Sequence, residues 1–270
     1  MRKKLLIIIP AYNEAGTIGQ LLDKLEEPEI ADIADVLIMN DASVDITPFI
    51  ARNRGHNVVT HVFNLGYGSG LQVGYKYAIR RGYEYVIQMD ADGQHDASNI
   101  LKLYSELTTP DENGRCPDIV VGSRFMEGAG SFPISFVKQF AISMFRGIIR
   151  ITTGQKITDP TSGLQGLNKR TVWYYSKYKH FDDKYPDANM LTQMILLGYY
   201  VKEIPAVMHD RSGGVSMHTG LLKQGIYMVR MVFSIIAVLL RVSSYGMDRE
   251  SVNEYERIEE INITKNRQTV

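Results

Sequence analysis

Two carboxylates separated by one residue, Asp90 and Asp92, stand at the end of an apolar run in the segment 86–96 (VIQMDADGQHD). Gly93 loosens the turn that follows them. Oxygen donors at the end of a buried strand suit a hard divalent cation, which keeps some waters and takes further ligands from substrate phosphates. The pattern therefore predicts a Mg²⁺ or Mn²⁺ site. Asp and Gly are also ordinary turn formers, so the same residues taken alone fit a turn without chemistry.

The composition limits the partners of such a site. The 30 basic and 30 acidic residues cancel, so we expect no nucleic-acid partner, and any attraction to a membrane must be local. A single cysteine, Cys116, excludes an intrachain disulfide and a cysteine zinc cluster, which fits a reducing cytoplasm. The basic residues 2–4 precede only five apolar residues, too few for a signal peptide, so we expect the first buried strand there.

Apolar runs alternate with helical patterns through the first 122 residues, which is typical of a parallel sheet with right-handed crossovers. The expected strands lie near 4–9, 35–40, 58–63, 84–89 and 118–122, and the expected helices near 14–26, 45–53, 69–81 and 97–107. The length of 270 residues fits one core with a C-terminal appendage. The predicted fold class is α/β.

Polar residues follow several of these strands, in the segments 10–14 (PAYNE), 40–43 (NDAS), 90–94 (DADGQ) and 122–124 (GSR). Ligands of open α/β sheets bind outside the carboxyl ends of strands, so these loops should converge on one crevice. A fifth loop, 64–70 (NLGYGSG), opens a helix whose N-terminal amides would face a phosphate, although its glycines fit a tight turn equally well.

The second half of the chain is less regular. Residues 132–153 are apolar almost all round, which favours a buried helix over one that contacts lipid. A short region of mixed strands follows, then a helix near 187–198, a strand near 199–206 and a long helix near 219–242.

Several sequence blocks, in a fixed order along residues 4–217, carry a family resemblance. They are P-A-Y-N-E, N-D-A-S in place of the usual D-D-G-S, N-L-G-Y-G, D-A-D-G-Q-H, G-S-R, D-P-T-S-G and R-S-G-G-V-S. Taken together they resemble the family-2 inverting glycosyltransferases with the GT-A fold, a Rossmann-like, mostly parallel sheet flanked by helices. The nearest branch contains dolichyl-phosphate mannose synthase and the bacterial polyprenyl-phosphate glycosyltransferases.

The resemblance implies a role for each matching residue. The nucleotide sugar would be bound by Pro10, Ala11, Tyr12, Glu14, Asp41, Asn64, Gly68, Asp90, Ala91 and Asp92. Asp41 would accept hydrogen bonds from the base. The metal, Mg²⁺ or Mn²⁺, would be held by Asp90, Asp92 and Gln94. The sugar and acceptor pocket would comprise Arg124, Asp159, Ser162, Gly163, Arg211 and Ser216. Catalysis would depend on Asp92, Arg124, Asp187 and Arg211.

The chemistry of the reaction supports two of these assignments. When a nucleoside diphosphate leaves, negative charge builds on its terminal phosphate, and a bridging cation with flanking guanidinium groups stabilises that charge. Arg124 and Arg211 would supply the guanidinium groups. The alternative for each arginine is a surface salt bridge without a catalytic role.

One position departs from the family pattern. Many family-2 enzymes that glycosylate hydroxyl groups carry a catalytic carboxylate before the helix expected at 187–198, where this chain has Asp187 and then Asn189. Asp187 fits a base, a binding residue or a helix N-cap, and the last two are favoured. A hydroxyl acceptor needs a base, whereas a phosphate monoester with a second pKa near ~6 is already largely ionised at neutral pH. The weak base signature therefore points to a lipid-phosphate acceptor.

Residues 218–245 form an apolar or amphipathic region whose most apolar part is 225–242. There Arg230 and Arg241 leave only ten residues between charges. A spanning helix needs ~20 mostly apolar residues, so we expect a helix that lies in the membrane interface or packs against a partner subunit. The polar tail, 246–270, should hold a short helix near 249–262 and a frayed end. The catalytic domain would be residues 1–217.

The sequence therefore predicts a metal-dependent inverting glycosyltransferase. It would move a sugar from a UDP- or GDP-linked donor to a polyprenyl phosphate, as a peripheral enzyme on the inner face of the cell membrane. One alternative is transfer to a hydroxyl of a growing cell-surface polysaccharide, with Asp187 as base. Another is a non-catalytic partner that binds a nucleotide sugar. Two protein partners are also considered, a second copy of this chain and a small membrane protein.

Overall fold

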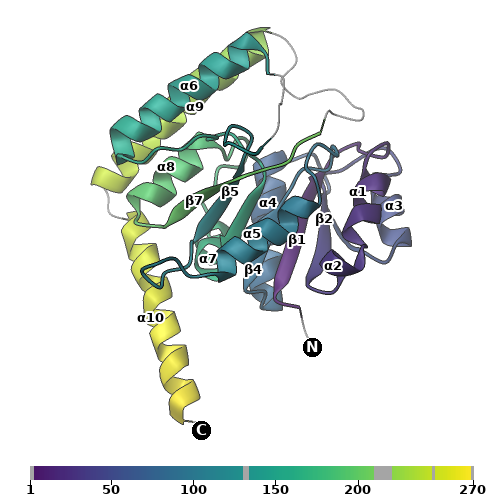
Figure 1. Cartoon of the computed structure of the whole chain (residues 1–270), viewed down its shortest axis with the longest axis horizontal. Coiled ribbons are helices and arrows are strands. Elements are labelled where there is room, and N and C mark those ends of the chain that lie inside the picture. The colour runs from purple at the N-terminus through teal and green to yellow at the C-terminus, as the bar shows by residue number, and fades with distance from the viewer. Residues whose placement is uncertain (1–2, 130–133, 210–220, 245–246, 269–270) are drawn as a thin grey trace.

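A seven-stranded sheet forms the centre of the molecule (Figure 1). The computed structural model describes residues 3–129, 134–209, 221–244 and 247–268. The strands are β1 (Leu5–Ala11), β2 (Ala34–Asn40), β3 (Asn57–Thr60), β4 (Tyr85–Gln88), β5 (Ile119–Ser123), β6 (Gln165–Asn168) and β7 (Val201–Pro205). Their spatial order is β3-β2-β1-β4-β6-β5-β7. The predicted α/β class is confirmed.

Helices flank the sheet on both faces. They are α1 (Ile18–Leu25), α2 (Pro28–Ala31), α3 (Thr47–Asn53), α4 (Tyr67–Arg81), α5 (Ser98–Thr108), α6 (Phe136–Thr153), α7 (Lys169–Ser176), α8 (Ala188–Leu196), α9 (Leu221–Ser244) and α10 (Met247–Gln268). Helices α2 and α7 lie where the sequence pattern predicts no helix. Apart from α10, the other helices match the expected segments, with ends that differ by a few residues.

Strand β1 shows why the sheet is buried on both faces. Leu5, Ile7 and Ile9 pack into a core with α1, α3 and α5, whereas Leu6 and Ile8 pack into a second core with α4, α7 and α8. Neighbouring residues of a strand point to opposite faces, so a strand covered on both sides reads as a continuous apolar run. This double burial explains the uninterrupted run Leu5–Ile9.

Strand β6 is the exception to the expected parallel sheet. It lies between β4 and β5 and pairs antiparallel with both, while the other neighbouring strands are parallel. Its Gly166 lies against α5, where a Cβ atom would come within 2.8 Å of Leu107 Cδ1. The residues of β6 are few and partly polar, so their sequence does not reveal the direction of the strand.

Helices α6 and α9 contact each other, and both contact α8, which lies between them and the sheet (Figure 1). The prediction that residues 132–153 form a helix buried all round is wrong for one face of α6. Phe145 is fully buried, but Phe136, Phe140 and Ile151 are exposed to 83%, 60% and 85%. An α-helix that packs on one side of a domain buries only one stripe of its apolar residues.

Helix α10 is longer than the short helix predicted for the polar tail, and it contacts α7 and α9. The rings of Trp173 and Tyr255 lie 5.4 Å apart between centroids. Ion pairs join Lys177 to Glu254 and Arg170 to Glu256. The first part of the tail is therefore held to α7 by side-chain contacts.

One helix in the described part of the chain, over Gly225–Val242, is long and apolar enough to cross a membrane by length and composition. Core helices of soluble proteins pass the same test, but only 22% of this stretch is buried. Its buried residues include Met231, Ile235 and Val238, which pack inward. Met228, Val232 and Leu239 are partly buried against the same core. Ile226, Val229, Phe233, Ile236 and Leu240 are exposed.

Candidate active site

The loops that follow β1 and β2 are joined by backbone and side-chain hydrogen bonds. The amide of Asp41 donates to the carbonyl of Ala11 (2.9 Å), and the amide of Val44 donates to Asn13 Oδ1 (2.9 Å). Between these contacts Tyr12 is 48% exposed. The carboxyl ends of the first two strands therefore converge as predicted, with an aromatic side chain open to a ligand.

Asp41 holds the neighbouring loop with its carboxylate. Its Oδ1 accepts from the amide of Leu65 and pairs with His61 Nδ1, and its Oδ2 accepts from the amide of Gly66, each at 2.8 Å. A carboxylate offers about four lone-pair positions, so roughly one acceptor position is left for the base that the family resemblance assigns to it. The structure adds a role that the sequence did not predict, which is to fix the loop 61–66.

The other residues expected to bind the nucleotide differ in access. Asn64 is exposed, and Pro10 and Glu14 are half-buried. Ala11 and Ala91 are each only 3% exposed, so they would reach a ligand through backbone atoms alone.

Asp90 and Asp92, which we call the metal corner, follow β4, the neighbour of β1 in the sheet. The hydroxyl of Tyr67, at the start of α4, donates to Asp90 Oδ1 (2.9 Å). Burial, reinforced by the charge of Asp90, raises the pKa of the Tyr67 phenol well above its usual value, so it stays a proton donor. Asp92 Oδ1 accepts from the amide of Gln94 (3.1 Å), which closes the turn.

The chain approaches Asp90 closely at Gly163. Gly163 faces this carboxylate, and a Cβ atom at Gly163 would lie 2.9 Å from Asp90 Oδ2. Among the described residues no group of three or more His, Cys, Asp or Glu side chains gathers in metal-ligand positions. A divalent ion would therefore be held by Asp90 and Asp92, with Gln94 nearby, and would complete its shell with water and donor phosphates.

The metal corner is tied to the segment that leads into the last sequence block. The amide of His209 donates to the carbonyl of Gln94 (2.8 Å), and the His209 ring lies 2.6 Å from Asp96 Oδ2. Burial opposes the ionisation of Asp96, but hydrogen bonds from Ser98 and His209 lower its pKa to about 2. The expected site residues Arg211 and Ser216 lie outside the described residues.

Arg124 is paired with a fully buried carboxylate. Its Nε and Nη2 lie 2.7 and 2.8 Å from the two oxygens of Asp159, and Nη2 also donates to Thr161 Oγ1 (2.9 Å). Burial lowers the pKa of the guanidinium, but the hydrogen bond and charge of Asp159 outweigh it and raise the pKa above its usual value. The salt bridge considered for Arg124 is present, but it is buried and bidentate and does not lie at the surface.

Asp159 and Ser162 do not line a pocket in the way the resemblance implies. Asp159 is fully buried and its amide donates to Glu203 Oε1 (2.8 Å). Ser162 is 4% exposed and its hydroxyl donates to the carbonyl of Gly122 (2.6 Å). Both side chains already have protein partners, so they support the site from behind and Gly163 is the member of this block that faces it.

The glycine-rich loop 64–70 serves close packing. Gly66 has φ 97°, a conformation that favours glycine, and a Cβ atom at Gly68 would clash with the carbonyl oxygen of Asp182. The amide of Ser69 donates to the carbonyl of Asp183 (3.0 Å). The amide of Ser69 is thus occupied by the chain itself, and the tight turn considered for this loop explains its glycines.

Asp187 occupies the N-cap position of α8, but its side chain does not cap the helix. The side chain of Asn189 accepts instead from the amide of Met190 (2.9 Å). The Asp187 carboxylate accepts a hydrogen bond from the hydroxyl of Tyr227 in α9 (2.6 Å). Of the three roles considered for Asp187, the side-chain cap is wrong.

Burial raises the pKa of Asp187 to about 6, although the hydrogen bond from Tyr227 acts in the opposite direction. The charges of Asp90 and Asp182 add to the rise, and Arg124 opposes it. A carboxylate with a pKa moved toward neutrality beside a metal corner is a mark of functional sites.

Replacing Asp187 with asparagine should stabilise the folded protein at neutral pH. The pKa of Asp187 in the folded state lies above the unfolded value of ~3.9. Ionisation of the carboxylate therefore lowers the free energy of unfolding as the pH rises from about 4 to about 6, and the full loss persists at higher pH. We expect Asp187→Asn to raise the free energy of unfolding by about 1–3 kcal/mol at pH 7.5 and to leave it unchanged near pH 4. Urea unfolding at both pH values, in EDTA, measures this.

The exposed neighbour Asp183 is the matched control, and Asp183→Asn should change neither value. Equal stability of Asp187→Asn and wild type at pH 7.5 would show that Asp187 is not strained in the folded state.

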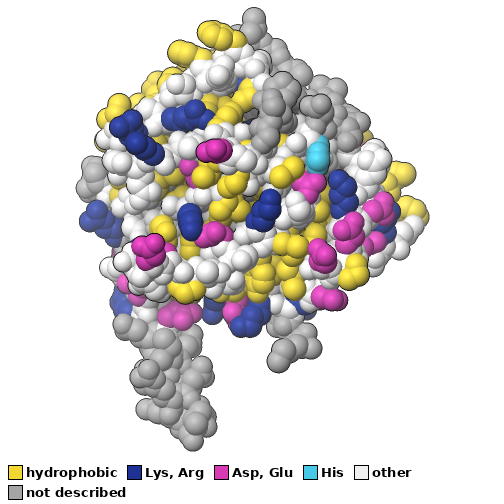
Figure 2. Space-filling view, viewed as in Figure 1, with side chains coloured by type: hydrophobic (Ala, Val, Ile, Leu, Met, Phe, Trp, Pro, Cys, Tyr) yellow, Lys and Arg dark blue, Asp and Glu magenta, His cyan; other side chains and the backbone are white. Residues whose placement is uncertain are grey.

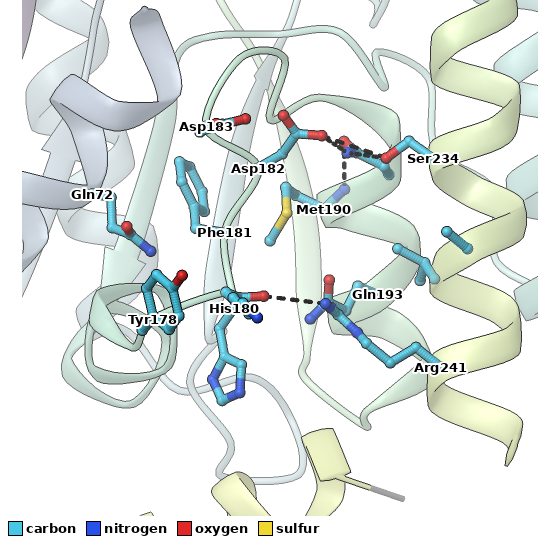
Figure 3. Close-up of a pocket in the computed structure, with 14 residues that line it drawn as sticks. Gln72, Tyr178, His180, Phe181, Asp182, Asp183, Met190, Gln193, Ser234 and Arg241 are labelled. Carbon is cyan, nitrogen blue, oxygen red and sulfur yellow. Dashed lines mark hydrogen bonds between the residues drawn. The ribbon is translucent and has the colours of Figure 1, made fainter. Parts of the chain in front are cut away.

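A pocket of about 510 Å³ lies between the segment 178–183, α8 and α9 (Figure 3). Its walls include Gln193, Ser234 and Arg241. Neither Asp90 nor Asp92 lines it. Because the predicted metal ligands lie outside this pocket, we expect the active site at the metal corner and not in the pocket.

Sequence reasoning missed three side chains of the site. Tyr67 stands inside the N-L-G-Y-G block, and His61 precedes that block by three residues, so both could have been found from the block. Tyr227 lies in an apolar helix 40 residues from Asp187, and no local pattern marks it.

Comparisons with known proteins agree with this architecture. The model of Glycosyl transferase family 2 matches residues 6–175. The chain is 29% identical to undecaprenyl-phosphate mannosyltransferase of Micrococcus luteus, over 80% of this chain and 88% of that protein. It is 25% identical to polyprenol monophosphomannose synthase of Mycolicibacterium smegmatis, over 81% of this chain and 82% of that protein.

A solved structure shares the GT-A fold. It is glucosyl-3-phosphoglycerate synthase from Mycobacterium tuberculosis in complex with Mn²⁺, UDP-glucose and phosphoglyceric acid. The TM-score is 0.65 at 15% identity, and the match covers 88% of this chain and 80% of that one. Because the family model matches more than half of this chain, the chain belongs to glycosyl transferase family 2 and is a glycosyltransferase.

Proposed function

We propose that this enzyme transfers a sugar from a nucleotide diphosphate donor to a polyprenyl phosphate at the inner face of the cell membrane, with inversion at the anomeric carbon. The observation that carries the proposal is the apolar face of α6 and α9, which stays exposed while α9 reaches the active site through Tyr227. The names of the two curated relatives support the lipid-phosphate acceptor.

The exposed face is built from both helices. It comprises Phe136, Phe140 and Ile151 of α6 and Ile226, Val229, Phe233, Ile236 and Leu240 of α9. Figure 2 shows hydrophobic side chains along the upper left edge of the molecule, where Figure 1 places these helices. A polyprenyl phosphate presents its head group at the bilayer surface, so its enzyme must bring the cleft close to that surface.

In the proposed reaction, an oxygen of the acceptor phosphate attacks the anomeric carbon while the bond to the terminal phosphate of the nucleotide breaks. Asp90 and Asp92 would hold Mg²⁺ or Mn²⁺, which neutralises charge on the leaving diphosphate when bound. Arg124 adds positive potential behind the cleft, although Asp159 takes its hydrogen-bond donors. The attacking phosphate is already ionised, so no side chain has to remove a proton.

The direct test is transfer of a radiolabelled sugar to undecaprenyl phosphate in detergent micelles, with a panel of UDP- and GDP-sugars and added Mn²⁺ or Mg²⁺. Metal-dependent labelling of the lipid from at least one donor is expected. Labelling of a polysaccharide or oligosaccharide hydroxyl, with the lipid unlabelled, would reject the proposal.

The rival acceptor is a sugar hydroxyl, and the raised pKa of Asp187 favours it because a general base works best with a pKa near the operating pH. The two acceptors differ in the expected effect of Asp187→Asn. With a phosphate acceptor the variant should keep measurable turnover, whereas a hydroxyl acceptor requires the base and predicts complete loss with donor binding unchanged.

Changing Phe233, Ile236 and Leu240 together to serine should weaken membrane binding. These side chains are 67%, 44% and 57% exposed, so the change removes apolar surface that would enter the bilayer interface and leaves the core intact. In vesicle flotation we expect the wild type to float with anionic vesicles and to stay partly bound at high salt. The variant should stay mostly in the bottom fraction.

A matched control changes three other exposed apolar residues, Val44, Val62 and Phe63, to serine, which should not alter flotation. If the wild type does not float and is a dimer that the α9 substitutions dissociate, the exposed face is a subunit interface.

A further inference from the structure

Helix α9 is hydrogen-bonded to the segment beside the metal corner. The hydroxyl of Tyr227 donates to Asp187 Oδ2 (2.6 Å). Two turns further along, the hydroxyl of Ser234 lies 2.8 Å from Asn189 Nδ2, which also donates to Asp182 Oδ2 (2.8 Å). Figure 3 shows Ser234 and Asp182 facing each other across this contact. The helix is therefore attached to the segment 182–189 by polar contacts as well as by packing.

The ring of Tyr227, in α9, packs against one ring of α6 and one ring of the segment 182–189. Phe145 of α6 meets it edge-on at 6.2 Å between centroids, and Tyr185 meets it edge-on at 5.3 Å. Arg230, one turn along α9, lies over the ring of Tyr185. Such edge-to-face contacts fix ring orientation, so the direction of the Tyr227 hydroxyl depends on how α6 and α9 are seated.

The Asp187 carboxylate needs an external restraint to keep one orientation. It lies in the field of two like charges, Asp90 and Asp182, and of one opposite charge, Arg124. An ionised side chain in such surroundings turns away from the like charges unless a donor holds it. The bond from Tyr227 occupies Oδ2 and leaves Oδ1 to accept a hydrogen bond from a hydroxyl group, as a donor sugar presents.

We propose that Tyr227 is a positioning residue that fixes the Asp187 carboxylate toward the sugar of the donor, so that the orientation of this carboxylate depends on the seating of α6 and α9. The membrane part of this inference rests on the proposed function. A bilayer that seats the two helices then raises turnover by ordering the active site, in addition to gathering the lipid acceptor.

The test is Tyr227→Phe, which removes the hydroxyl and keeps the ring contacts with Phe145 and Tyr185. We expect kcat/KM for the donor to fall roughly ten- to a hundredfold, as for loss of one hydrogen bond to a charged group. If Tyr227 acts through Asp187, adding Tyr227→Phe to Asp187→Asn should cause no further loss. Tyr178→Phe removes a hydroxyl from a residue that is 79% exposed and should match the wild type.

The membrane dependence is measured with a short-chain polyprenyl phosphate dispersed in buffer, with and without empty anionic vesicles. Vesicles should accelerate the wild type severalfold and accelerate Tyr227→Phe much less. Independent losses in the double variant would overturn the proposal, and so would full vesicle acceleration in Tyr227→Phe.

A third measurement does not use turnover. The hydrogen bond from Tyr227 favours the ionised form of Asp187, so its loss should move to higher pH the range over which Asp187 costs stability. To find this pH range, urea unfolding of the wild type is compared with that of Asp187→Asn across pH. The same comparison is made between Tyr227→Phe and the double variant. An unmoved range would overturn the inference. A wild type that never labels polyprenyl phosphate would reject the proposed function alone.

Discussion

Replacing Asp90 with asparagine is expected to lower turnover about 10³-fold or more, with the fold intact. The substitution removes the charge that would hold a divalent cation, and loss of that much transition-state stabilisation corresponds to about 4 kcal/mol. The amide oxygen of asparagine can still accept the hydrogen bond that the Tyr67 hydroxyl donates to Asp90 Oδ1, so the corner should keep its shape. Asp92→Asn should have a comparable effect.

The measurement is steady-state transfer over a titration of Mn²⁺ and Mg²⁺, together with circular dichroism and thermal unfolding. Asp32→Asn, at an exposed carboxylate, is the control and should keep wild-type activity. Excess EDTA should abolish wild-type turnover, and added Mn²⁺ should restore it. If either Asp90→Asn or Asp92→Asn is fully active in EDTA, the corner does not hold a metal.

Replacing Asp159 with alanine is expected to destabilise the fold by about 3–5 kcal/mol, because it leaves the guanidinium of Arg124 buried without its partner. Asp159 has no exposed surface and receives both Nε and Nη2 of Arg124, so water cannot take the place of the lost carboxylate. Chemical denaturation measures the loss. Removing both partners should cost less than the sum of the single changes, because no uncompensated charge is left.

The control is an exposed ion pair of the same kind. Lys4 and Glu84 lie 3.0 Å apart with side chains 62% and 45% exposed, and Glu84→Ala should leave the unfolding midpoint almost unchanged. If Asp159→Ala also unfolds at the wild-type midpoint, the pair is not a structural support. The position would then be open to the direct contact with the sugar or acceptor that the resemblance implies.

The sequence predicted those parts of the fold in which local pattern and burial agree. The run Leu5–Ile9 marks a central strand because both of its faces are covered, and the polar residues that follow β1 and β2 meet as the parallel topology requires. Strand β6 was not predicted as antiparallel, because four residues with a glycine carry no signal of direction. The exposed face of α6 was missed because apolar residues surround that helix on every side.

The site was predictable in its residue types and less so in its partners. The metal corner follows from two carboxylates and a glycine after one strand, which is a local pattern. The pairing of Arg124 with Asp159, and of Tyr227 with Asp187, joins residues 35 and 40 positions apart. The first contact joins the end of β5 to the segment before β6, and the second joins α9 to the start of α8. The sequence of no single element contains that information.

The approach of Gly163 to Asp90 also limits how this enzyme can evolve. Any side chain at residue 163 would begin 2.9 Å from Asp90 Oδ2 and 3.1 Å from the Tyr67 hydroxyl. A side chain there would push both groups away by a few tenths of an ångström, and such a shift would alter the metal corner. Three positions far apart in the chain are thus expected to vary together or not at all, and a library that randomises residue 163 alone should return glycine.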